Sequence, residues 1–133
     1  MNDSNSRART LALQKRCFEF SCAVISAYPR GRIDDASRII WRQLLKAATS
    51  STFNLEEADA ASSDADFVAK MRITLRESKE AHVAIRLIER CRLAGDAAVT
   101  GQKDEANQLA SIFHAIVKNK RENMKRAARR SNS

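Results

Sequence analysis

Apolar residues recur along the chain at steps of three and four, which is the period of an α-helix. The first stripe covers about Arg7 to Tyr28, the second Ile40 to Ala58, and a third starts at "SSDADF". A fourth runs from Leu109 to Met124. The pattern predicts four amphipathic helices of roughly 22 to 30 residues, each about 35–45 Å long. The core stripe of the first helix is Leu13, Cys17, Phe20, Val24 and Tyr28, widened by Phe18 and Ile25.

Breaks in the pattern predict where these helices begin and end. The segment "PRGRIDD" stops the first helix, because proline disfavours helix before it and glycine permits a sharp turn. Ser63 and Asp66 are three apart, which resembles a capping box at the start of the third helix. Gly95 predicts the end of that helix. The N-cap candidates for the second helix are Asp34, Asp35 and Ser37.

The stretch "ATSSTFN" in the second helix is rich in serine and threonine, as a linker would be. It contains no glycine or proline, however, and the helical spacing of apolar residues continues through it. We therefore predict helix here, with the turn later, at "AASSDAD". The small side chains would let a neighbouring helix approach closely, within the bundle or between subunits.

The chain has the length of one domain, 133 residues, and contains only three glycines and one proline. This composition favours an all-α protein with few connections. Short connections between long amphipathic helices favour antiparallel neighbours. The predicted fold is an up-down-up-down antiparallel four-helix bundle over residues 7–126, with a disordered N-terminus at residues 1–6 and a flexible basic tail at residues 127–133.

The net charge of +8 lies at the two ends of the chain. Residues 118–130 hold seven Lys/Arg and one Glu, and residues 1–30 hold five Lys/Arg and two acids, so the remaining residues are close to neutral. In an up-down bundle both basic ends lie at the same pole as the turn between the second and third helices. That turn is acidic, so part of the basic excess is expected to be neutralised there.

A basic helix end is the electrostatic signature of a nucleic-acid contact. It is also typical of an ordinary solvated helix end, where cations complement the helix dipole. The basic segment has no aromatic residue for stacking, so binding would be to phosphates and would weaken with salt. The predicted contacts are Lys118, Lys120, Arg121, Lys125, Arg126, Arg129 and Arg130, adjoined by Arg7, Arg9, Lys15 and Arg16.

Polar residues also flank the turn between the second and third helices. A polar network there would fix the register of helices and the oligomeric state. Its predicted members are Lys46, Asn54, Glu57, Glu77 and Glu80. A metal site in a bundle requires a Glu-x-x-His spacing, which neither His82 nor His114 satisfies. We therefore expect no metal and no cofactor.

Enzyme chemistry has no support in the sequence, which lacks a glycine-rich phosphate loop and a G-x-S-x-G elbow. The three cysteines Cys17, Cys22 and Cys91 lack metal-ligand spacing and are expected to be reduced. No apolar run reaches the roughly 20 residues that span a bilayer. The N-terminus shows no signal peptide. We expect a cytoplasmic, non-enzymatic protein that does not enter a membrane.

The segment "QLLKAATSSTFNLEEADAASSDADFVAKMRITLRESKEA" resembles the signature of the four-helix-bundle family named for 23S ribosomal RNA intervening sequences. Thr52, Ala58 and Thr74 depart from the usual proline, glycine and alanine of that family. The residues that carry the resemblance are Gln43, Leu44, Lys46, Ala47, Ala48, Ser50, Asn54, Glu57, Ser62, Asp66, Phe67, Leu75, Glu77 and Glu80.

The resemblance implies an up-down bundle that assembles into a homo-oligomer, typically a pentameric ring with a central channel. Accessory variability proteins of diversity-generating retroelements look like relatives, and their basic ring is implied to bind a reverse transcriptase and its RNA. The resulting hypothesis is an accessory or scaffold protein that contacts RNA, DNA or a nucleic-acid enzyme. The alternative is a purely structural protein-interaction ring without nucleic-acid binding.

Overall fold

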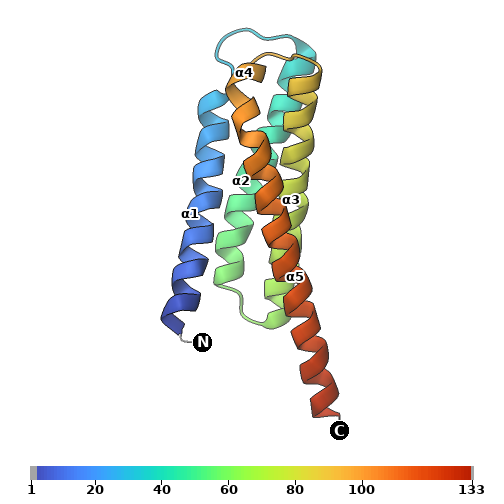
Figure 1. Ribbon diagram of the computed structural model, residues 1–133. Helices are drawn as coiled ribbons and strands as arrows, with labels where there is room; N and C mark the ends of the chain where they lie inside the picture. The colour runs from blue at the N-terminus through green and yellow to red at the C-terminus, as the bar shows by residue number, and fades with distance from the viewer. Residues whose placement is uncertain (1–2, 133) are drawn as a thin grey trace.

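Four long antiparallel helices form the bundle in a computed structural model that describes residues 3–132 (Figure 1). No strand occurs in that range. The chain passes up, down, up and down, so the α2–α3 turn and both ends of the described chain lie at one pole, as predicted. The elements are α1 (Asp3–Ala27), α2 (Asp35–Asp59), α3 (Asp64–Arg90), α4 (Asp96–Val99), the 3-10 helix η1 (Thr100–Gln102) and α5 (Lys103–Ser131).

The helix starts follow the predicted caps. The Asp34 carboxylate accepts a hydrogen bond from the backbone N–H of Ser37 at 2.9 Å, which selects Asp34 from the three candidates. The Ser63 hydroxyl accepts from the N–H of Asp66 at 3.1 Å, and the Asp66 carboxylate accepts from the N–H of Ser62 at 3.3 Å. This reciprocal pairing satisfies backbone donors that the first turn of a helix leaves free.

Three helix ends differ from the sequence-based prediction. α1 already begins at Asp3, and α5 continues to Ser131, so described residues expected to be disordered or flexible are helical. Neither segment contains a glycine or proline that would stop a helix. α3 ends at Arg90 rather than near Gly95, because Arg92 adopts a left-handed conformation with φ 52° and turns the chain. Met1, Asn2 and Ser133 lie outside the described residues.

The connection from α3 to α5 contains the single-turn helix α4, which the sequence did not predict. Trp41 of α2 donates from its indole Nε1 to the Ala94 carbonyl at 2.6 Å, and the Ala94 N–H donates to the Ser37 hydroxyl at 3.0 Å. Gly95 has φ 77°, and a Cβ there would lie 2.9 Å from side-chain atoms of Pro29 and Trp41. We call this group of contacts the latch; it closes the end of the bundle opposite the termini.

The core lies between the helices and is filled mainly by the predicted stripes. Phe18 and Ile25 are exceptions, because 56% and 45% of their surfaces remain exposed. They lie at the edge of the α1 stripe, where the neighbouring helices of the same chain do not cover them. The largest fully buried side chains are Trp41, Phe113, Leu44, Met71, Ile85, Ile88 and Leu109.

The "ATSSTFN" stretch is helical and forms a close seam between α1 and α2. The Ser21 hydroxyl of α1 donates to the Ala48 carbonyl at 2.8 Å, and the Thr52 hydroxyl of α2 donates to the Cys17 carbonyl at 3.1 Å. Bonds from a side chain to the backbone of another helix require the two helices to lie close together. The seam therefore lies within the bundle.

No helix in the described range is long and apolar enough to cross a membrane.

Candidate nucleic-acid interface

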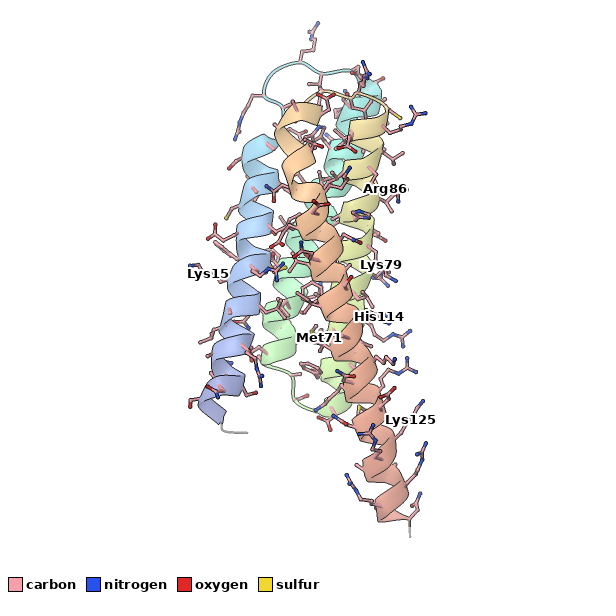
Figure 2. All side chains as sticks on the ribbon, viewed as in Figure 1. Lys15, Met71, Lys79, Arg86, His114 and Lys125 are labelled. Carbon is pink, nitrogen blue, oxygen red and sulfur yellow. The ribbon has the colours of Figure 1, made fainter. Side chains whose placement is uncertain are left out.

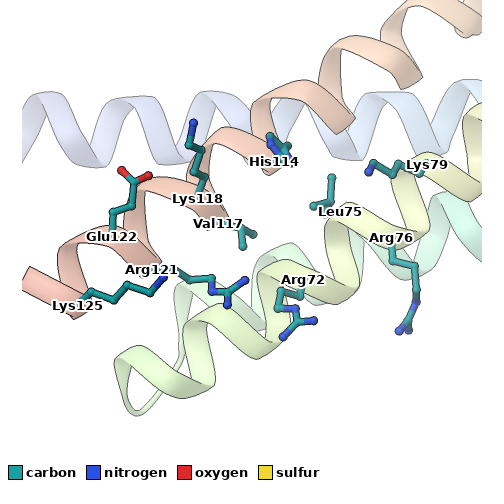
Figure 3. Close-up of a pocket in the computed structure, with 10 residues that line it drawn as sticks. All are labelled: Arg72, Leu75, Arg76, Lys79, His114, Val117, Lys118, Arg121, Glu122 and Lys125. Atoms are coloured by element: carbon teal, nitrogen blue, oxygen red, sulfur yellow. The ribbon is translucent and has the colours of Figure 1, made fainter.

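A groove of about 590 Å³ lies between α3 and α5 near the pole of the termini (Figure 3). We call it the lower groove. Leu75 of α3 and Val117 of α5 lie at its apolar centre, and the surrounding side chains are long and charged. Six are cations and one, Glu122, is an acid. The cations are Arg72, Arg76 and Lys79 from α3, with Lys118, Arg121 and Lys125 from α5.

Helical periodicity explains why these cations share the groove. Arg72, Arg76 and Lys79 follow steps of four and three, so they lie along one side of α3. Lys118, Arg121 and Lys125 follow steps of three and four along one side of α5. Leu75 and Val117 are adjacent to these rows on the side that faces the neighbouring helix. Each helix therefore uses an apolar row to pack and the next row to present positive charge.

Most of this charge is not neutralised. Arg76 has one ion pair, a contact of 3.8 Å with Glu77. The other five groove cations form no ion pair with any described residue. Glu122 pairs with Arg126, at 3.9 Å, rather than with a groove cation. The lower groove is therefore a site of concentrated positive potential that is open to solvent.

Several cations predicted from the sequence are instead occupied by neighbouring acids. Arg7 donates to Asp59 at 2.8 Å, which lowers the pKa of that carboxyl. Arg16 forms two hydrogen bonds with the Glu105 carboxylate, at 3.0 and 2.5 Å, and this contact raises the pKa of the guanidinium.

On α5, Lys120 lies 2.8 Å from Asp64 and 5.6 Å from the centre of the Phe67 ring. It lines a separate hollow at the α2–α3 turn rather than the lower groove. The partial neutralisation expected at this pole is thus present in the Arg7–Asp59 and Lys120–Asp64 pairs.

The remaining predicted contacts do not line the lower groove. Lys15 is exposed on α1, on the opposite side of the molecule from Lys79 and Lys125 (Figure 2). Arg9 is exposed on α1, and Arg129 and Arg130 are exposed on the last turn of α5. Of the eleven predicted contacts, the structure brings together only Lys118, Arg121 and Lys125 in this groove.

The predicted polar network divides into separate contacts. The Asn54 amide donates to the Ser50 carbonyl of its own helix at 2.9 Å, and Glu57 lies 3.4 Å from Lys70. Glu77 is only 8% exposed, and its Oε2 has no hydrogen-bond partner among the described residues. Burial raises the pKa of Glu77, and the neighbouring Glu80 raises it further, whereas Arg76 and Lys46 lower it. Lys46, Glu77 and Glu80 thus form one group, without Asn54 and Glu57.

Arg72, Arg76 and Lys79, together with His114, which also lines the groove, were not among the predicted contacts, because the middle of the chain is close to neutral in total. Their spacing along the helices was the available signal.

The described residues contain no group of three or more His, Cys, Asp or Glu side chains that could hold a metal ion. Chemically, the groove offers multiple cationic donors to an anionic partner.

Comparisons with known proteins show what this chain resembles. Neither a protein-family model nor a curated protein sequence matches it. A solved structure does match: a protein of unknown function from the S23 ribosomal protein family of Bacteroides thetaiotaomicron. The match has a TM-score of 0.68 at 21% sequence identity and covers 82% of this chain and 97% of that chain. This likeness confirms the four-helix-bundle fold.

Proposed function

We propose that this chain is a non-enzymatic, cytoplasmic, homo-oligomeric bundle that binds nucleic acid through the lower groove. It would serve as an accessory or scaffold protein for nucleic acid or for a nucleic-acid enzyme such as a reverse transcriptase. The observation that carries the proposal is the set of six cations that α3 and α5 place around one groove, five of which form no ion pair with a described residue. Side chains of this kind bind phosphates and release counterions from a polyanion.

Assembly is supported by apolar side chains that one chain leaves in water. Leu11, Phe18 and Ile25 are spaced by seven residues on α1 and are about half exposed. Phe53 of α2 is 67% exposed. Burial of such side chains contributes roughly 25 cal/mol per Å². A pentamer, as the family resemblance implies, would also repeat the groove and strengthen binding through multivalency.

Fluorescence anisotropy with a labelled 20-nucleotide RNA or DNA, titrated from low to high salt, tests the binding. We expect affinity to fall steeply with salt; a salt-independent affinity would contradict phosphate contacts. If the protein assembles but binds no nucleic acid, the alternative of a structural interaction ring is correct. The exposed apolar residues of α1 and α2 are the observation that favours this alternative.

Light scattering on the same sample measures the assembly. Phe53→Ser is expected to reduce the mass, with Thr49→Ser as a conservative control on the same helix. Glu80→Ala tests the predicted role of the polar residues in assembly. A full-mass oligomer for Glu80→Ala would remove that role, and a monomeric wild-type protein would remove the proposed assembly.

A further inference from the structure

The lower groove continues along the seam between α3 and α5. A second hollow beyond it shares Lys79 and His114 with the lower groove, and a third shares His82 and Val83 with the second. Figure 2 shows Arg86, Lys79, His114 and Lys125 in order along the same side of the bundle. The three hollows are thus one continuous track.

The far part of the track is also positive. Arg86 and Arg90 line the third hollow, and neither forms an ion pair with a described residue. Lys103 lies there too, but the Glu89 carboxylate accepts its hydrogen bond at 2.7 Å. Burial lowers the pKa of His82, and the charges of Arg86 and Lys103 lower it further. The α3 row therefore presents Arg72, Arg76, Lys79, Arg86 and Arg90 on one side.

The length of this row limits the ligand. Arg72 and Arg90 are 18 residues apart, which corresponds to about 27 Å of α-helix. That distance matches about eight base pairs at 3.4 Å each. A compact anion such as a single nucleotide would contact one section of the track and leave the other cations unused.

The track also lacks the side chains that hold single strands. None of its lining residues is Phe, Tyr or Trp, whereas single-strand grooves combine cations with aromatic platforms. A duplex presents about one charge per 1.7 Å of axis, twice the density of one strand, in an order that is already fixed. Cations fixed in straight rows on rigid helices gain more binding free energy from such a ligand than from a single strand.

On the basis of the proposed function, we infer that the whole α3–α5 track is a binding site for double-stranded nucleic acid, held by its phosphates without base readout. Arg86 and Arg90 extend the site to about eight base pairs. The double variant Arg86→Gln/Arg90→Gln removes two phosphate contacts from the far end. It is expected to reduce the salt slope of log K against log salt by about 2 for a 20-base-pair duplex.

The test compares that duplex with one of its strands, using fluorescence anisotropy on the full chain. The matched control is Arg32→Gln/Arg42→Gln, which removes two exposed charges outside the track; circular dichroism verifies the folding of both variants. We expect the duplex to bind more tightly and only the track variant to lose slope. Three results would overturn the inference and leave nucleic-acid binding by the lower groove in place. They are an unchanged slope for Arg86→Gln/Arg90→Gln, tighter binding of the single strand, and equal competition by polyglutamate. No binding of either nucleic acid overturns both.

Discussion

The two ends of the bundle are held together in different ways. At the latch, Trp41, Ser37 and Ala94 exchange hydrogen bonds between α2 and the chain that follows α3, and Gly95 packs against the indole. At the opposite end α5 extends beyond the α2–α3 turn (Figure 1), and its groove cations Lys118, Arg121 and Lys125 form no ion pair with a described residue. One end is closed by specific packing, whereas the other is open and charged.

This difference separates stability from binding. Unpaired cations repel one another and add little to the folded state, but they are available to a polyanion. Packed and hydrogen-bonded groups contribute to stability and are unavailable to a ligand. Substitutions at the latch should therefore alter the free energy of unfolding, and substitutions in the groove should alter binding alone.

The largest effect is expected at Gly95. Gly95→Ala places a methyl group 2.9 Å from Pro29 and Trp41 and requires a left-handed alanine. We expect a loss of about 3 kcal/mol in the free energy of unfolding, measured by urea denaturation. Gly31 is the control, because its φ is 92° but an added Cβ would meet nothing within 4 Å. Gly31→Ala should cost about 1 kcal/mol; equal losses at the two glycines would show that the close packing of the latch is unimportant.

Next in size is the loss of binding from the lower groove. Arg72→Gln/Arg121→Gln removes from each helix one cation that forms no ion pair with a described residue. It should weaken binding of a 20-base-pair duplex about tenfold, with a salt slope smaller by about 2. Unfolding by urea should be unchanged. The control, Arg7→Gln/Arg16→Gln, removes two cations that are paired with Asp59 and Glu105. If both double variants weaken binding equally, pairing does not decide which cations bind.

A smaller effect is expected at Glu77, whose buried carboxyl has a raised pKa. Below pH 4.5, which is the ordinary pKa of a glutamate side chain, the Glu77 carboxyl is protonated in both the folded and the unfolded chain. As the pH rises, the unfolded chain ionises first, so the folded state loses stability until the pH passes the raised pKa. Glu77→Gln should therefore be more stable than the wild type by about 1 kcal/mol at pH 7 and similar to it at pH 4.

Thermal or urea unfolding of Glu77→Gln at both pH values measures this effect. Glu56→Gln is the control, because Glu56 is exposed on α2. A gain in stability for Glu77→Gln that persisted unchanged at pH 4 would contradict a cost of ionisation as its cause.

The smallest effect is expected from the Arg16–Glu105 pair between α1 and α5. Its side chains are 40% and 29% exposed, so solvent screens the attraction. A double-mutant cycle with Arg16→Gln and Glu105→Gln should give a coupling free energy of about 0.5 kcal/mol that decreases with salt. A coupling of several kcal/mol would show that this partly exposed ion pair contributes as much to stability as buried packing does.

Local signals in the sequence were sufficient to predict the four helices, the cap at Ser63, three candidates for the cap that Asp34 provides, and the helical "ATSSTFN" stretch. The lower groove could not be predicted in the same way, because it depends on how α3 and α5 are rotated about their axes. Arg72 and Lys118 are far apart in sequence, and only packing brings them to the same hollow. The exposure of Phe18 has the same origin, since a neighbouring helix decides whether the edge of a stripe is covered.

The latch also has a consequence for the order of folding. Its hydrogen bond joins Trp41 to Ala94, 53 positions apart, whereas α2 and α3 are joined by a short turn. Contacts between distant residues require the larger loop closure, which costs more conformational entropy. The α2–α3 hairpin is therefore the natural nucleus, and the latch forms after it. Substitutions at Gly95 should then mainly increase the rate of unfolding and leave the rate of folding nearly unchanged.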